Sequence, residues 1–534
     1  MKSWETDVLV VGGGLAGIRA AVEARRAGSA VLLVSLSPVG KANNSAISKG
    51  HFAIPGAGGP GDDFERHFQD IIAGGCRISD PGLVSAMIEN LKDEVNFLLD
   101  CGVRLARRSD GSLVRSRPPG HSFPRVLSTT RGSGVEVLAP LAARAKEMGV
   151  RMVEGIEILS LLTGGEEVCG AWGCARSGEP VLIQAKAVIL ATGGAGSLYL
   201  RTNNAPGTAG LGQAMALSAG LSLVDMEFVQ FYPTYLHMPG KPRVMIFYEV
   251  LVAVAGATLR NRYGEDIRKL YGMEDVSDLT RDRLSRAIAS EIRAGRGVGA
   301  DGEAVALDLS TLTDPEKYRR HLPRAVPPDA AAVNVAPVAH FTMGGVAVKP
   351  GGETEIPGLW AVGEVAGGIH GANRVGGNAL AECLAMGRAA GSAAAAHALK
   401  PGRRQCPARE IKFPCGPGAG PENLSGLAEA LRRILNNHAG VLRDAAGLAE
   451  GLAGINDLQD ALKKSLGSDN SMVAFKLGMM LDVARAICLS ALMRRESRGS
   501  HFRADYPAER EDCLGNFLVK KVDGELEIQF RPRQ

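Results

Sequence analysis

The sequence predicts an α/β fold, and three features of the chain support this prediction. A short apolar strand at residues 7–11 leads into a glycine-rich turn at residues 12–17, and a helical stretch follows. A second apolar strand at residues 30–34 completes a β-α-β unit with G-x-G-x-x-G at its first turn. Glycine accounts for 68 of the 534 residues, which indicates many tight turns and close backbone approaches. Together these features predict a Rossmann-like, dinucleotide-binding start to the chain.

The glycine turn has the residue types that phosphate binding requires. Gly12 is expected to make the turn, Gly14 to let a pyrophosphate approach the backbone, and Gly17 to let the helix pack on the strand. Leu15 and Ala16 open that helix, and its positive N-terminus favours a phosphate group.

The strand ends that follow refine this prediction. The second strand ends at Ser35, where dinucleotide-binding proteins usually carry an acidic residue for a ribose hydroxyl. A serine hydroxyl can bond the ribose but supplies no charge, which weakens a specific NAD assignment. A later apolar strand at residues 187–191 ends in a second glycine turn, Thr192-Gly193-Gly194.

Changes in composition along the chain predict its domains. Charged residues become denser between residues 235 and 334, and a helix at about 280–295 is expected there. Its charged residues are expected to form a solvated face, not a site: Arg281, Asp282, Arg286, Glu291 and Arg293. Glycine-rich α/β sequence then resumes, and a stretch rich in Pro, Gly and Cys precedes three amphipathic helices. The predicted units are residues 1–234 with 335–400, an insert at 235–334, a linker at 401–424 and a C-terminal unit at 425–534.

The composition excludes several classes of protein. The 61 basic and 57 acidic residues are interspersed and aromatics make up 5%, so a nucleic-acid partner is not expected. The nine scattered cysteines form no CxxC pair, and no cluster of ligands suits zinc or an iron–sulfur centre, so no metal is expected. Dispersed cysteines indicate reduced thiols and a cytoplasmic location. No apolar stretch of about 18 residues occurs, so membrane attachment is expected only through a partner.

Stretches spread over nearly the whole chain resemble the flavoprotein subunit of fumarate reductase and succinate dehydrogenase, a family that also includes L-aspartate oxidase. They follow the order of that family and lie at residues 12–17, 120–125, 191–194, 225–231, 338–345, 361–364, 370–380 and 495–507. The resemblance implies an α/β protein with a Rossmann-like FAD-binding domain, an inserted α+β capping domain and a helical C-terminal domain. The boundaries given above agree with that layout.

The resemblance also implies the cofactor and the residues that hold it. In succinate dehydrogenase and membrane fumarate reductases, a histidine in the loop after the second strand carries FAD covalently, and Asn44 occupies that position here. An amide cannot make this bond, so FAD is predicted to be bound non-covalently, as it is in other members of the family. Glu364 is expected at the ribityl or ribose region. The residues expected to bind FAD are Gly12, Gly14, Leu15, Ala16, Gly17, Ser35, Asn44, Ser45, Gly50, Ala191, Thr192, Gly193, Gly194, Gly363, Glu364, Arg374, Asn378, Ala379 and Leu380.

Two substrate ligands of the family are retained and two other positions depart from its pattern. Arg374 and His340 are expected to bind a substrate carboxylate. Tyr232 stands where the family has a histidine, so one ionic contact to a dicarboxylate is lost. The resemblance also implies a proton-shuttling arginine after Tyr248 and Glu249, but that stretch is apolar, with Val252 or Ala253 at the arginine position. Tyr232, Tyr248 and Glu249 are then the candidate proton carriers.

These features predict an FAD-dependent oxidoreductase that moves a hydride between flavin N5 and a carbon of a carboxylate-bearing substrate. Plain succinate–fumarate chemistry is not expected, because the shuttle arginine is absent. Two alternatives are a flavoprotein electron-transfer subunit of a larger redox complex and an L-aspartate oxidase-like enzyme. Electrons are expected to reach oxygen, a quinone, or an iron–sulfur or other electron-transfer subunit. A structural role is as probable as a site role for His121 and His370, and His501 is expected at an interdomain contact.

Overall fold

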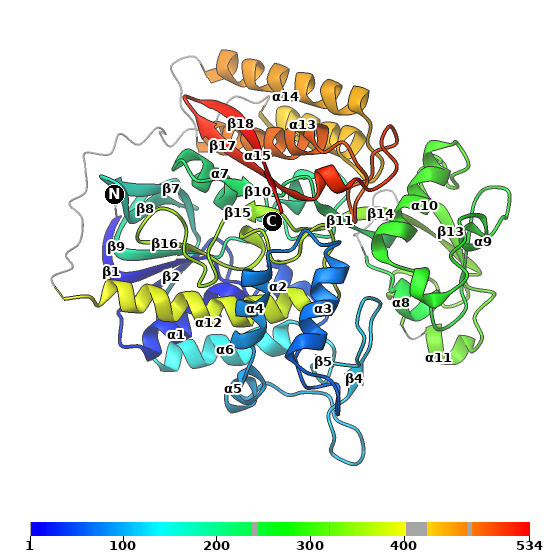
Figure 1. Cartoon of the computed structure of the whole chain (residues 1–534), viewed down its shortest axis with the longest axis horizontal. Coiled ribbons are helices and arrows are strands. Elements are labelled where there is room, and N and C mark those ends of the chain that lie inside the picture. The colour runs from blue at the N-terminus through cyan, green and yellow to red at the C-terminus, as the bar shows by residue number, and fades with distance from the viewer. Residues whose placement is uncertain (1, 238–243, 320, 402–423, 467–471, 534) are drawn as a thin grey trace.

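The computed structural model describes residues 2–237, 244–319, 321–401, 424–466 and 472–533 (Figure 1). Most of the predicted linker at 401–424 lies outside these residues. Among the described residues, no helix combines the length and the apolar character that crossing a bilayer would need.

A seven-stranded sheet forms the centre of the FAD-binding domain. Its order is β6-β2-β1-β9-β8-β7, and β16 also pairs with β9. Strands β6, β2, β1, β9 and β16 pair in parallel, whereas β7 and β8 form antiparallel pairs. The strands are β1 (Lys2–Val11), β2 (Val31–Ser35), β6 (Arg151–Glu154), β7 (Ile156–Gly164), β8 (Glu167–Ala175), β9 (Pro180–Leu190) and β16 (Leu359–Ala361). The carboxyl ends of the parallel strands meet at one edge, where α/β sheets bind their ligands.

Helices α1 and α12 pack against each other beside the parallel strands, with α6 next to α1 (Figure 1). Val8 and Val10 face these helices, whereas Leu9 and Val11 pack into a second hydrophobic core on the opposite face, which explains the uninterrupted apolar run at residues 8–11. The helices of this domain are α1 (Leu15–Arg26), α2 (Asn44–Ile47), α3 (Phe64–Gly74), α4 (Pro81–Asn90), α5 (Glu94–Asp100), α6 (Val135–Glu147), α7 (Leu211–Ser218) and α12 (Asn378–Ala398). A small sheet of β3 (His51–Ala53), β5 (Val126–Ser128) and β4 (Arg115–Ser116) lies among them.

The inserted capping domain projects to one side of the sheet (Figure 1). It contains an antiparallel sheet of order β11-β14-β13-β12 and a hydrophobic core of its own. Its strands are β11 (Val229–Leu236), β12 (Thr258–Arg260), β13 (Val305–Asp308) and β14 (Ala332–Thr342). Its helices are α8 (Tyr248–Leu251), α9 (Ile267–Leu270), α10 (Arg281–Arg293) and α11 (Pro315–Arg319). The chain enters along β11 and returns along β14, so these two paired strands connect the cap to the FAD-binding domain.

Three helices and a hairpin form the C-terminal part: α13 (Leu424–His438), α14 (Ala445–Leu466), α15 (Met472–Met493), β17 (Gly515–Val522) and β18 (Glu525–Pro532). Strand β17 pairs with β10 (Leu223–Val224), which also pairs with β15 (Gly345–Val346). The C-terminal hairpin therefore completes a sheet begun by the FAD-binding domain. Short 3-10 helices lie at Gly196–Leu198, Val276–Asp278, Gly363–Val365 and Glu511–Cys513.

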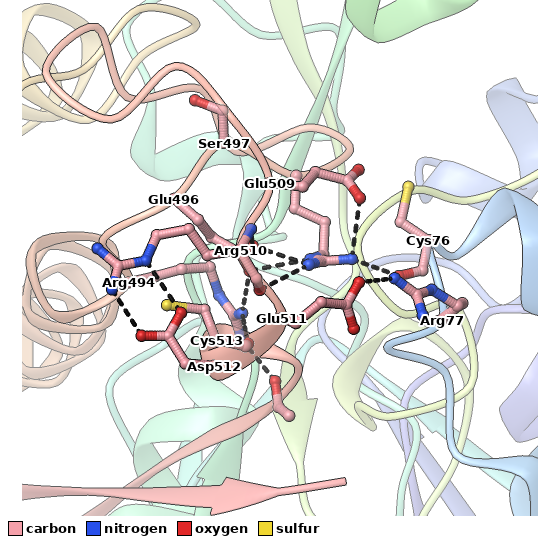
Figure 2. Close-up of polar contacts among 12 residues, drawn as sticks. Cys76, Arg77, Arg494, Glu496, Ser497, Glu509, Arg510, Glu511, Asp512 and Cys513 are labelled. Atoms are coloured by element: carbon pink, nitrogen blue, oxygen red, sulfur yellow. Dashed lines mark hydrogen bonds and ion pairs between the residues drawn. The ribbon is translucent and has the colours of Figure 1, made fainter.

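A network of ion pairs fixes the segment between α15 and β17 (Figure 2). The Glu496 carboxylate accepts from Arg494 at 2.8 Å and from Arg498 at 2.9 Å, and all three side chains are fully buried. Arg498 also donates to the carbonyl of Cys76 at 3.2 Å, and Arg77 pairs with Glu511. The C-terminal domain is thus bound to the loop between α3 and α4 of the FAD-binding domain.

Candidate active site

The first glycine turn fits a dinucleotide phosphate. Gly12 has φ of +125°, and a Cβ atom there would lie 2.1 Å from the carbonyl oxygen of Ala191, so only glycine fits. A Cβ atom on Gly14 would instead meet only the Ser45 hydroxyl, at 3.6 Å. The backbone at Gly14 is therefore open toward the N-terminus of α1, where amide groups of the first turn favour an anion.

The other predicted cofactor residues gather at the same edge of the sheet. Ser35 ends β2, residues 191–194 follow β9, and Gly363 and Glu364 follow β16. Asn378 begins α12, with Ala379 and Leu380 in its first turn, while Ala16 and Gly17 lie in the first turn of α1. Gly50 directly precedes β3. Segments more than 300 residues apart in sequence thus surround one region.

Buried polar atoms without partners mark this region as one that a ligand completes. Thr192 Oγ1, Arg374 Nε and Asn378 Nδ2 are buried and have no hydrogen-bond partner among the described residues. Because unsatisfied buried polar groups are costly, three of them in the predicted cofactor loops indicate a missing polar ligand. The glycine cradle and these donors fit FAD.

Asn44 and Glu364 are brought together from opposite ends of the domain. The Asn44 amide donates to Glu364 Oε2 at 3.1 Å and to Asn204 Oδ1 at 2.6 Å, and its oxygen accepts from the Ala205 amide at 2.9 Å. Glu364 Oε1 accepts from the Thr342 amide at 3.1 Å. Burial raises the pKa of Glu364 to about 7, so this carboxyl is partly protonated near neutrality.

Arg374 and His340, the predicted substrate ligands, lie side by side. Arg374 Nη2 donates to His340 Nε2 at 3.3 Å and to Gln230 Oε1 at 3.1 Å. Since a guanidinium only donates, His340 Nε2 accepts, and Nδ1 donates to Asn203 Oδ1 at 3.2 Å. Burial and the charges of Arg281 and Arg374 hold the pKa of His340 well below its usual value. The imidazole is therefore neutral.

The Arg374 guanidinium is buried, and no carboxylate among the described residues forms an ion pair with it. Burial, together with the neighbouring charge of Arg281, lowers the pKa of Arg374 to about 9. Its Cζ lies 4.5 Å from the centroid of the Phe341 ring. It is a charged group at neutral pH that an anionic ligand would stabilise.

The capping domain supplies a second set of polar groups. The Tyr232 hydroxyl donates to Glu249 Oε2 at 2.6 Å, and Arg281 Nη2 lies 3.4 Å from Glu249 Oε1. Arg281 Nη1 also donates to Gln230 Oε1 at 3.0 Å, and its Cζ lies 5.5 Å from the centroid of the Tyr232 ring. The Tyr248 ring packs against that of Tyr232, with centroids 5.6 Å apart. Three residues predicted for the site, Tyr232, Tyr248 and Glu249, therefore lie close to Arg281.

Arg281 corrects one sequence-based prediction. It was expected on a solvated helix face, but its side chain is only 19% exposed and points into the site. It also places a guanidinium beside Glu249, whereas Val252, at the expected arginine position, is buried in the core of the capping domain. Glu291 is another exception to the solvated face, since it is buried and paired with Arg296 at 2.6 Å. Helical spacing could have located Arg281, because it precedes buried Leu284, Ser285 and Ile288 by three, four and seven residues.

Gln230 is a residue of the site that was not singled out from the sequence. Its amide oxygen accepts from both Arg281 and Arg374, and its amide nitrogen donates to Asn373 Oδ1 at 2.7 Å. Asn373 in turn donates to Asp282 Oδ1 at 2.9 Å. These bonds connect α10 of the cap to the loop that carries Arg374.

Three other histidines hold loops in place. His370 Nε2 lies 2.8 Å from Glu382, and His121 Nε2 lies 2.6 Å from the Gly376 carbonyl. His501 is fully buried, with Nδ1 2.8 Å from Arg443, and its ring packs edge-on against that of Phe228 in the FAD-binding domain, which is the predicted interdomain contact. Ser500, next to it, donates to the Ala372 carbonyl at 3.0 Å. The segment between α15 and β17 therefore contacts the loop that carries Arg374.

Comparison with known proteins agrees with this geometry. The family model described as FAD binding domain matches residues 7–380, and the one described as fumarate reductase flavoprotein C-term matches residues 428–533. One subunit of the fumarate reductase (CoM/CoB) of Methanothermobacter marburgensis is 34% identical over 99% of this chain and 98% of its own length. L-aspartate oxidase of Agrobacterium fabrum is also 34% identical, over 93% and 91%. A variant of the flavoprotein FrdA of Escherichia coli quinol fumarate reductase superposes with a TM-score of 0.90 at 30% identity, covering 100% of this chain and 97% of that one.

The fold and the site define an FAD-dependent oxidoreductase of the type that acts on CH–CH bonds. The chain belongs to the fumarate reductase/succinate dehydrogenase flavoprotein family, which also includes L-aspartate oxidase. The predicted fold class, with its capping and helical C-terminal domains, is confirmed.

Proposed function

We propose that the chain transfers a hydride between FAD and a carbon atom of a carboxylate-bearing substrate. One observation carries this proposal: the buried Arg374 guanidinium lacks a carboxylate partner among the described residues and lies beside neutral His340. A buried cation without an anion is costly, so a substrate carboxylate accepting two parallel bonds from Arg374 would relieve that cost.

Each residue of the site then has a distinct role. Arg374 binds the carboxylate, and His340 orients it through a hydrogen bond. Arg281 holds the proton that moves to or from the substrate carbon, and Glu249, 3.4 Å away, exchanges protons with it. FAD, when bound, supplies the hydride acceptor or donor. The capping domain closes the site and keeps water from the reacting atoms.

The substrate range follows from the same groups. Because Arg281 is present, the apolar stretch around Val252 no longer argues against succinate and fumarate. The replacement of a histidine by Tyr232 still removes one cationic contact. The names of the relatives, fumarate reductase and L-aspartate oxidase, support a small carboxylate as substrate.

FAD is proposed to be bound without a covalent link. Asn44 offers no nucleophilic atom for such a bond, and its amide is engaged by Glu364, Asn204 and Ala205. A yellow holoprotein that releases its flavin on acid precipitation would support this proposal. Flavin that stays with the precipitated chain would contradict it.

Electrons are proposed to pass between this chain and a separate redox partner, and the first candidate is an iron–sulfur subunit. The sequence contains no CxxC pair, and one relative is named as part of a larger enzyme. A cytoplasmic location, with any membrane contact made through that partner, is part of the same proposal.

The test is anaerobic reoxidation of the reduced flavin by a panel of unsaturated carboxylates, together with bleaching of the oxidised flavin by saturated ones and by L-aspartate. We expect at least one carboxylate to respond, and Arg374→Gln to weaken its binding at least 30-fold, which corresponds to about 2 kcal/mol. Arg433→Gln is the matched control, because Arg433 is exposed on α13. No response to any carboxylate, with normal reduction by a partner, would favour an electron-transfer subunit instead.

A further inference from the structure

The charges of the site limit how many carboxylates it can hold. Arg281 faces Glu249 at 3.4 Å, so these two charges largely offset each other. His340 is neutral, and Tyr232 and Tyr248 stay protonated because burial and the Glu249 carboxylate raise the pKa of both hydroxyls. Of the two arginines in this group, only Arg374 is free to pair with a substrate.

Two buried aromatic side chains, those of Tyr232 and Tyr248, lie beside these charges. Tyr232 and Tyr248 are each 1% exposed, and the Tyr232 ring lies 5.6 Å from both the Tyr248 ring and the His340 ring. The Tyr232 hydroxyl proton is already donated to Glu249 at 2.6 Å. A second substrate carboxylate near these tyrosines would therefore meet the Glu249 carboxylate, and neither Arg281 nor neutral His340 is available to balance it.

We propose that this site accepts a substrate with a single carboxylate, bound by Arg374, whose other end is uncharged and packs against Tyr232 and Tyr248. The class that fits is a short 2-enoic acid or its saturated counterpart. In the reductive direction the carbon–carbon double bond gains one hydride and one proton, and both electrons come from reduced FAD. This inference rests on the proposed function and specifies its substrate class.

Lys49 is the competing cation that the test must separate. Its Nζ lies 4.0 Å from the centroid of the Phe247 ring, directly before Tyr248 in the sequence. Its side chain is exposed, and no carboxylate among the described residues pairs with it. If Lys49 held a second substrate carboxylate, dicarboxylates would bind well in spite of Tyr232 and Tyr248.

The experiment is a titration of the oxidised holoenzyme at constant ionic strength, read from the perturbation of the flavin absorbance spectrum. Crotonate and butyrate are compared with fumarate and succinate. We expect the monocarboxylates to bind at least tenfold more tightly. The comparison needs no variant and measures binding without turnover.

Three variants test which residues cause the preference for monocarboxylates. Tyr232→His is expected to bring the two classes within a few-fold of each other, because an imidazole beside the Glu249 carboxylate can take up a proton and donate to a second substrate carboxylate. Tyr232→Phe is expected to keep the preference. Lys49→Met is the control and is expected to leave all four dissociation constants unchanged.

Equal or tighter binding of dicarboxylates by the unmodified enzyme would overturn the inference. A selective loss of dicarboxylate binding in Lys49→Met would overturn it as well. If none of the four acids perturbs the flavin while another carboxylate of the panel reacts with it, this inference fails and the proposed function stands. If no carboxylate of the panel reacts, or if Arg374→Gln leaves carboxylate binding unchanged, the proposed function itself fails.

Discussion

Replacing Arg281 is the most direct test of how protons move in this enzyme. Arg281→Gln removes the positive charge and the proton that the proposed mechanism needs, while keeping a polar side chain. Arg281→Lys keeps the charge near Glu249, but one ammonium group cannot also reproduce the second contact, to Gln230 at 3.0 Å. The two variants therefore separate charge from geometry.

The expected magnitudes follow from the position of Arg281. A positioned proton donor contributes about 10²- to 10⁴-fold to a rate, or about 3–5 kcal/mol in the barrier. Arg281→Gln should lower the rate of the chemical step by that factor. It should also lower the free energy of unfolding by about 1–3 kcal/mol, since it leaves the Glu249 carboxylate without its cationic partner. This cost is below that of a fully buried pair, because the Arg281 and Glu249 side chains are 19% and 25% exposed.

The assay is single-turnover reoxidation of the reduced enzyme, with substrate binding measured separately by flavin spectral titration. The binding constant should change only a few-fold in Arg281→Gln, because Arg374 holds the carboxylate. Arg281→Lys should recover most of the lost stability but little of the rate. Arg293→Gln, on the exposed end of the same helix, is the control. A rate for Arg281→Gln within fivefold of the unmodified enzyme would refute the assignment.

Three further predictions test the cofactor region and the C-terminal network. Gly12→Ala should give protein that binds no FAD, since its Cβ would lie 2.1 Å from a carbonyl oxygen, and retained yellow colour would contradict this. In the apoprotein, the raised pKa of Glu364 makes the folded state bind the proton more tightly than the unfolded state. Stability should therefore fall by up to about 3 kcal/mol as pH rises from about 4.5 to about 7, and Glu364→Gln should flatten this slope in denaturant unfolding. Glu496→Gln should cost about 3–5 kcal/mol, because it breaks buried pairs with two arginines, against less than about 1 kcal/mol for exposed Glu511→Gln; equal costs would count against the network.

The fold could be predicted from the sequence because its signals are local. The apolar strand at residues 7–11, the glycine turn after it and the amphipathic C-terminal helices each form within a short stretch. Their order along the chain, compared with that of a known family, then supplied the arrangement of domains.

The substrate site could be predicted only in part, because it depends on contacts between distant segments. Arg374 and His340 were found through their motifs, but an arginine at the start of a charged helix was expected to be solvated. Only the packing of α10 on β11, where Ser285 donates to the Phe231 carbonyl at 3.2 Å, turns Arg281 inward. Gln230 gave no signal of its own, since an amide in an apolar strand becomes informative only when both arginines are in place.

Gln230 accepts from an arginine of the cap and from an arginine of the FAD-binding domain through a single oxygen atom. Any outward swing of α10 would break the first of these bonds and the neighbouring bond between Asn373 and Asp282. Arg374, proposed to bind the carboxylate, and Arg281, proposed to supply the proton, would then be separated. In the proposed mechanism, the reactive arrangement therefore exists only while the two domains are docked.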